Sequence, residues 1–153
     1  LESAVRPALE SGRGGGIFRP LDLAAMEAAA EHLVGEHDFS SFRSSMCQSP
    51  TPVKHLRAIH IRRCGPVGAP TAYWRFDFEG QAFLHHMIRN LMGSLIQVGQ
   101  GLRPPEWIAE VLASRSREAA APTFMADGLY FVGPYYDAHH GLPTQTAAMQ
   151  WLP

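Results

Sequence analysis

The chain has 153 residues, of which 46% are hydrophobic and 18% are charged, and its formal net charge at pH 7 is −1. This length and composition are typical of one globular domain that buries a core of its own. No apolar run is long enough to span a membrane, and the near-neutral charge gives no global argument for nucleic-acid binding.

Residues 1–16 are predicted to be an interdomain linker or tail, and residues 17–153 to form one domain. The segment from Val5 to Gly16 is rich in glycine and lacks the Gly-Lys-Ser/Thr ending of a phosphate-binding loop. The chain has neither an initiator methionine nor the apolar core of a secretion signal. Its two cysteines have no metal-ligand spacing. We therefore expect a fragment of a longer protein that works in the reducing cytoplasm.

An amphipathic helix is predicted after Pro20 and Asp22, which are start signals, and before Gly35, which is a stop signal. Apolar residues recur along this stretch at the spacing of one helix face, namely Leu23, Met26, Ala30 and Leu33. Residues 37–52 then read mostly as a loop.

Two strands are predicted next, over residues 53–64 and 71–78. The second alternates cleanly, with Ala72, Trp74, Phe76 and Phe78 on one face and Thr71, Tyr73, Arg75 and Asp77 on the other. Such alternation is typical of a strand with one buried face in an antiparallel sheet. Residues 65–70 are predicted to be the hairpin loop between the two strands.

Three further elements complete the pattern. A helix is predicted from about Ala82 to Val98, a short helix over residues 103–115 with Trp107, Val111 and Leu112 inward, and a last strand over residues 127–137. Pro134 indicates that this strand lies at an edge or carries a bulge. The predicted fold class is α+β, a small and mainly antiparallel sheet with helices packed on one face.

Basic residues gather in one part of the chain. No Asp or Glu occurs between Phe39 and Phe76, whereas this stretch holds Arg43, Lys54, Arg57, Arg62, Arg63 and Arg75. Arginine suits phosphate because its planar fork can bond two oxygens, although genome composition is an alternative reason for the preference for arginine over lysine. Because side chains alternate along a strand, these residues cannot all face one side.

Eight histidines raise the question of a metal site, but their spacing argues against one. Residues 32–37 come close to the His-x-x-Glu-His zinc pattern, yet they hold one residue too many and Gly35 interrupts the helix. The pairs at 85–86 and 139–140 are adjacent, so on a helix their side chains point about 100° apart. We therefore expect no metal site.

Arg89 is the only charged residue between Glu79 and Arg103, and it lies in the most apolar helix of the chain. Gly93, one turn further on, costs helix stability of about 1 kcal/mol relative to alanine, and it allows another backbone to approach closely. Two interpretations of Arg89 are open. In the first, its side chain extends to solvent. In the second, it binds an anion supplied from outside this helix, and a buried arginine would require such an anion.

Four blocks of the sequence resemble, in the same order, segments of the TruA-type tRNA pseudouridine synthases. AFLHHMIRNLMGSLIQVGQG, residues 82–101, is similar to the signature helix of that family. Residues 5–13 are similar to the end of the family's N-terminal half, residues 35–56 to a loop and strand, and residues 128–143 to the closing strand. The resemblance covers nearly the whole chain.

The resemblance implies one half of a pseudouridine synthase fold. Members of the family isomerise uridine in the tRNA anticodon arm: the base is flipped out, detached, turned and re-attached through carbon, without metal or cofactor. Their nucleophile is an aspartate in an Arg-Thr-Asp-type segment of the N-terminal half. No aspartate of this chain has that context. The chain therefore resembles the C-terminal domain, and we expect it to be inactive alone.

The resemblance also implies roles for individual residues. Arg89 matches the arginine that pairs with the catalytic aspartate, and Leu129, Phe83 and Met87 match apolar positions at the uracil pocket; a core role for the last two is an open alternative. The candidate RNA-binding residues are Arg43, Lys54, Arg57, Arg62 and Arg63. The implied partners are the tRNA anticodon arm, the missing N-terminal domain and a second copy in a homodimer. A non-catalytic RNA-binding or dimerisation module is the alternative function.

Overall fold

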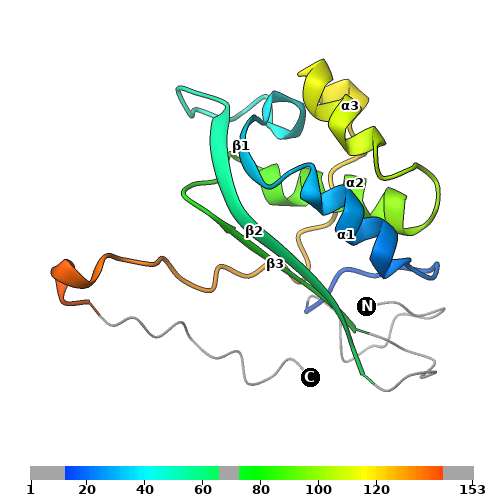
Figure 1. The fold of residues 1–153 in the computed structure, drawn as a ribbon, viewed down its shortest axis with the longest axis horizontal. Coiled ribbons are helices and arrows are strands. Elements are labelled where there is room, and N and C mark those ends of the chain that lie inside the picture. The colour runs from blue at the N-terminus through cyan, green and yellow to red at the C-terminus, as the bar shows by residue number, and fades with distance from the viewer. Residues whose placement is uncertain (1–12, 66–72, 143–153) are drawn as a thin grey trace.

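The structure, a computed structural model, describes residues 13–65 and 73–142. Figure 1 shows a curved antiparallel sheet of order β1-β2-β3 with the helices gathered on one of its faces. This arrangement confirms the predicted α+β class. The elements in chain order are α1 (Leu23–Glu31), β1 (Gly35–Asp38), the 3-10 helix η2 (Ser40–Phe42), β2 (Val53–Cys64), β3 (Tyr73–Gly80), α2 (Met87–Gly99), α3 (Trp107–Ser114), η3 (Arg117–Ala119) and η4 (Ala138–His140).

The first helix forms where the start signals placed it. The side chain of Asp22 accepts a hydrogen bond from the backbone N–H of Ala25 at 3.1 Å, which caps the N-terminus of α1. Strand β1 follows at Gly35, inside a stretch that the sequence predicted to be mostly loop from residue 37. Residues 35–38 lack the alternation of a strand, and they become one because they pair with residues 53–56 of β2.

Strand β2 pairs with β1 through residues 53–56 and with β3 from Leu56 to Cys64, and an irregularity between Leu56 and Ala58 shifts its alternation. Beyond that point Ile59 lies opposite Phe78 and Ile61 opposite Phe76, so these four side chains share the face that the helices cover. The predicted buried face of β3 is confirmed for Trp74, Phe76 and Phe78. The predicted hairpin loop at 65–70 lies largely outside the described residues.

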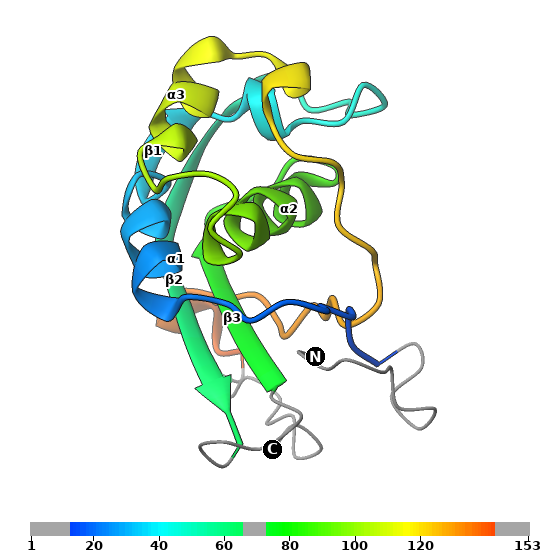
Figure 2. The same ribbon diagram turned by 90° about the vertical axis from the view of Figure 1, so that its right-hand side faces the viewer.

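The core lies between this face of the sheet and the three helices (Figure 2). Its fully buried side chains include Met26 of α1, Leu56 of β2, Leu91 and Leu95 of α2, and Ile108 of α3. Burying each such side chain contributes about 1.5–3 kcal/mol relative to leaving it exposed. No helix in the described part of the chain is both long and apolar enough to cross a membrane.

The predicted start of α2 was wrong by five residues, because the helix begins at Met87 and not at Ala82. His86 has a φ of 62°, a left-handed conformation that a helix cannot continue through. The preceding residues bond elsewhere: the backbone N–H of Ser44 donates to the His85 carbonyl at 3.2 Å, and the His85 N–H donates to the Cys47 sulfur at 3.4 Å. Contacts with a distant loop thus override the local helical pattern.

The predicted last strand over residues 127–137 is absent from the described structure. Pro134 has no N–H to donate to a ladder, and Gly133 has a φ of 150°. The segment instead exposes large apolar side chains, among them Leu129, Phe131 and Tyr135. This segment therefore forms no ladder within residues 13–65 and 73–142.

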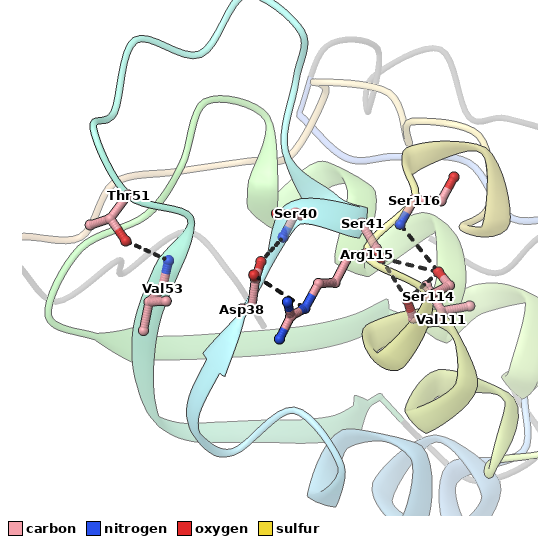
Figure 3. A network of polar contacts seen from close by, with 9 residues as sticks. All are labelled: Asp38, Ser40, Ser41, Thr51, Val53, Val111, Ser114, Arg115 and Ser116. Carbon is pink, nitrogen blue, oxygen red and sulfur yellow. Dashed lines mark hydrogen bonds and ion pairs between the residues drawn. The ribbon is translucent and has the colours of Figure 1, made fainter.

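A polar network fixes η2 to α3 and β1, as Figure 3 shows. Buried Ser41 donates its hydroxyl hydrogen to the Val111 carbonyl at 2.5 Å. Asp38 accepts from the Ser40 backbone N–H at 2.9 Å and forms an ion pair with Arg115 at 3.4 Å. The Ser40 hydrogen bond, and less strongly Arg115, lower the pKa of Asp38. These contacts fix the position of η2 between β1 and α3.

Candidate functional site

Arg89 lies in the first turn of α2 and is half-buried. Its side-chain Nε–H donates to the Phe124 carbonyl at 2.8 Å, while the Phe124 N–H donates to the Arg89 carbonyl at 3.1 Å. This reciprocal pair fixes the direction of the side chain. Four of the five guanidinium N–H groups, those on the two Nη atoms, then have no hydrogen-bond acceptor among residues 13–65 and 73–142.

Gly93 allows this contact, as the sequence predicted from its place one turn beyond Arg89. A Cβ at Gly93 would overlap the carbonyl oxygen of Pro122. The segment 120–124 therefore lies directly against α2 because this position has no side chain. Figure 2 shows the chain after η3 descending alongside α2.

Asn90 fastens the same segment from the next position of α2. It is 1% exposed, and its amide nitrogen donates to the Phe42 carbonyl at 2.8 Å. Its side-chain oxygen accepts from Thr123 at 2.6 Å and from Arg117 at 3.1 Å. Every side-chain hydrogen-bonding group of Asn90 except one amide hydrogen has a partner, so η2, α2 and segment 117–123 form one rigid unit.

The charge of Arg89 has no carboxylate partner in the described part of the chain, since the ion pairs there join other residues. The neighbouring side chains are themselves basic: burial, followed by the nearby charges of His85 and Arg89, lowers the pKa of His86, whose ring stacks on that of His85. A site of this kind attracts a negative charge from outside. Its one hydrogen bond to a neutral carbonyl orients the guanidinium and leaves its charge uncompensated.

The three apolar positions assigned to the substrate pocket have different environments. Leu129 and Phe83 are exposed, by 50% and 39% respectively. Met87 is fully buried in the core next to Leu84, which is the core role that the sequence left open for it. Of the three, only the first two present surface to a ligand in this structure.

The five candidate RNA-binding residues occupy several sides of the fold, as strand alternation predicted. Arg62 lies opposite Arg75 on the face of the sheet away from the helices, and its side chain is 57% exposed at 3.8 Å from Asp77. Arg63 lies opposite Trp74 on the other face. The remaining three are Arg57, exposed at the β2 irregularity, Lys54, half-buried opposite His37, and Arg43, half-buried in the loop after η2.

Sequence reasoning missed Arg117 and Thr123. Both reach Asn90, over 27 and 33 residues of sequence respectively, and no local pattern marks such contacts. No group of three or more His, Cys, Asp or Glu side chains in the described ranges is arranged to hold a metal ion.

Comparison with known proteins identifies the family. The family model described as tRNA pseudouridine synthase matches residues 29–137. The chain belongs to the tRNA pseudouridine synthase family. It is 62% identical over 153 residues to tRNA pseudouridine synthase A of Methylibium petroleiphilum, 61% identical over 154 residues to that of Polaromonas naphthalenivorans, and 54% identical over 169 residues to that of Delftia acidovorans.

These alignments cover 100% of this chain but only 56%, 57% and 60% of the respective relatives. The chain therefore spans little more than half the length of the synthases it matches. Arg89, Asn90, Gly93 and the segment that packs on them all lie within the residues that the family model covers.

Proposed function

We propose that the chain is the C-terminal domain, residues 17–153 with a linker at 1–16, of a tRNA pseudouridine synthase that isomerises uridine in the anticodon stem-loop. In this proposal the nucleophilic aspartate comes from the missing N-terminal domain, and the chain alone is inactive. Family membership and the coverage of the relatives support this proposal. The isomerisation uses no metal and no cofactor.

The observation that carries the proposal is the state of Arg89. Its Nε–H is bonded to Phe124, and its Nη edge has no acceptor among the described residues. A carboxylate bound to that edge would have its pKa lowered by the adjacent cation and would stay ionised at neutral pH. The hydrogen bond to Phe124 already restricts the rotation of the arginine side chain. The arginine therefore loses less conformational entropy when the aspartate binds.

The exposed apolar side chains of Phe83 and Leu129 are proposed to line the uracil pocket on this domain's side. A flipped-out base loses its stacking partners, and apolar surface replaces part of that contact. Met87 is proposed to support the pocket from within the core, since it is fully buried.

The basic residues of β2 and of the preceding loop are proposed to contact phosphates of the tRNA. Phosphate contacts spread over a surface supply most of the affinity for RNA and set its orientation. The full-length protein is further proposed to act as a homodimer in the cytoplasm. The proposed phosphate contacts are Arg43, Lys54, Arg57, Arg62 and Arg63.

The proposal is tested by incubating two samples with the same uridine-containing tRNA transcript: the full-length protein and this chain alone. Pseudouridine is expected from the first and not from the second. A transcript whose anticodon-arm uridines are replaced by cytidine is the matched control, and it should yield no product. Pseudouridine formed by the chain alone would contradict the proposal, and tRNA binding without product by the full-length protein would favour a non-catalytic module.

A further inference from the structure

A second site adjoins the start of α2, on the side of η2 and its following loop. It is an open depression of about 420 Å³, and its lining includes Arg43, Ser44, Ser45, His86, Arg117 and Thr123. The lining combines two guanidinium groups and an imidazole with several hydroxyl groups, and it contains no aspartate or glutamate. This composition suits an anion.

The two arginines in this depression are ordered without being neutralised. Arg43 donates two N–H groups from one Nη atom to the carbonyls of Cys47 and Ser49, both at 2.8 Å. Arg117 donates to the Ala121 carbonyl at 2.9 Å and to the side chains of Asn90 and Thr123. Neither arginine forms an ion pair within residues 13–65 and 73–142. Hydrogen bonds therefore hold both guanidinium groups in place, and no carboxylate among the described residues neutralises their charge.

Donors remain available at this surface. Two of the five N–H groups of Arg43 are used, which leaves three for a ligand. The Ser44 hydroxyl oxygen accepts from the Met46 backbone N–H at 3.2 Å, so its own hydrogen is free to donate. Ser45 is exposed at the tip of the turn closed by the Cys47 N–H and the Ser44 carbonyl, and its hydroxyl has no protein partner in the described structure.

We propose that this depression binds one phosphate of the RNA backbone, with Arg43 as the main guanidinium contact and the Ser44 and Ser45 hydroxyls as hydrogen-bond donors. Arginine and hydroxyl donors together match the charge and the several oxygens of a phosphodiester. The depression is open and large enough for the attached ribose to enter with it. The inference rests on the proposed function for its ligand, because it takes RNA to be the substrate.

Ser45→Glu is the sharpest probe, since it adds a negative charge to the depression without removing a hydrogen bond of the fold. Ser45→Gln has nearly the same shape and no charge, and it controls for size. Ala24→Glu adds the same charge at an exposed position of α1, a helix that contributes no residue to the depression, and it controls for net charge. All three are made in the full-length protein, and affinity for a tRNA transcript is measured from 50 to 300 mM salt.

Ser45→Glu is expected to weaken tRNA binding by about tenfold near 100 mM salt and to reduce the slope of log K against log salt by about 1, as for the loss of one phosphate contact. Ser45→Gln loses the hydroxyl donor but adds no charge, so its affinity should lie between those of the wild type and Ser45→Glu, whereas Ala24→Glu should stay within about twofold of the wild type. Equal affinities for Ser45→Glu and Ser45→Gln, whether both unchanged or both weakened, would overturn the inference.

A second measurement separates the two sources of phosphate. Inorganic phosphate alone is titrated into the full-length protein while the amide signals of Ser44 and Ser45 are followed by NMR. Shifts of these signals together with weakened tRNA binding by Ser45→Glu support the inference, whereas shifts without that loss would assign the depression to free anions and overturn it. Absence of pseudouridine formation by the wild type would refute the proposed function separately, because the comparison of RNA affinities does not depend on turnover.

Discussion

Arg89 and Phe124 are joined by two hydrogen bonds of opposite direction, from Nε–H to the Phe124 carbonyl at 2.8 Å and from the Phe124 N–H to the Arg89 carbonyl at 3.1 Å. The orientation of the guanidinium therefore depends on a segment 35 residues away in the sequence. Anything that displaces this segment from α2 should also release the arginine.

Gly93→Ala tests this dependence. Alanine favours a helix by about 1 kcal/mol over glycine. The new Cβ would nevertheless overlap the Pro122 carbonyl, which is backbone and cannot rotate away. We expect a net loss of stability of about 1–3 kcal/mol in urea unfolding of the full-length protein, typical of overpacking. Gln97→Ala, at a half-buried position of the same helix, should be nearly neutral; the prediction fails if the two variants are equally stable.

His86 should report the charge of Arg89. Its pKa is lowered by burial first, then by His85 and by Arg89. An NMR titration should therefore find its midpoint below that of an ordinary histidine, and Arg89→Gln should raise that midpoint. Arg103→Gln, beyond the other end of α2, should leave it unchanged. An Arg89→Gln midpoint equal to that of the wild type would show that the two side chains do not interact.

The same shift predicts how His86 acts on stability. Because its pKa is lower in the folded state, the unfolded chain binds the proton more readily. Its contribution is therefore neutral above about pH 6.5, the ordinary histidine value, and becomes destabilising as the pH falls through that value.

Asp38 should also make the fold less stable in acid, but at a lower pH than His86 does. Its pKa is lowered chiefly by the Ser40 hydrogen bond, so the stabilisation is present above the unfolded value of about 4 and is lost as the pH falls through the lower folded value. Asp38→Asn keeps an acceptor oxygen but loses the charge, and we expect it to cost about 1 kcal/mol at pH 7.

Urea unfolding at a series of pH values checks the expected pH dependence of the stability that Asp38 contributes. The difference in stability between the wild type and Asp38→Asn should shrink steadily below about pH 4. Glu27→Gln, at an exposed position of α1, serves as the control and should show little difference at any pH. If the difference in stability between the wild type and Asp38→Asn stayed constant down to pH 2, the charge of Asp38 would not be the source of the stabilisation.

Much of the fold follows from local signals. Asp22 caps α1 where its side chain predicted a start, and Trp74, Phe76 and Phe78 face the core as their alternation indicated. The isolation of Arg89 in an apolar helix and the lack of a side chain at Gly93 also indicated that another segment packs closely against this helix. These features are predictable because each depends on residues within one or two turns, or on one strand.

Other features depend on contacts that are distant in sequence. The helix α2 begins late because the loop at Ser44 takes the His85 carbonyl, and β1 exists because β2 pairs with it. Arg117 joins the site through Asn90, 27 residues before it. Residues 127–137 were predicted to form a strand, but a local sequence pattern alone does not supply a pairing partner. Periodicity carries no information on any of these pairings.

We propose that Arg89 acts on the reacting aspartate and not on tRNA binding. The most direct test measures, in the full-length protein with Arg89→Ala, the single-turnover rate of pseudouridine formation and the Kd for tRNA. We predict a rate lower by about 100-fold or more, as for loss of a group that stabilises charge at a reacting centre, with a Kd within about threefold of the wild type. An unchanged rate together with a large loss of tRNA affinity would show that Arg89 binds tRNA and does not act on the aspartate.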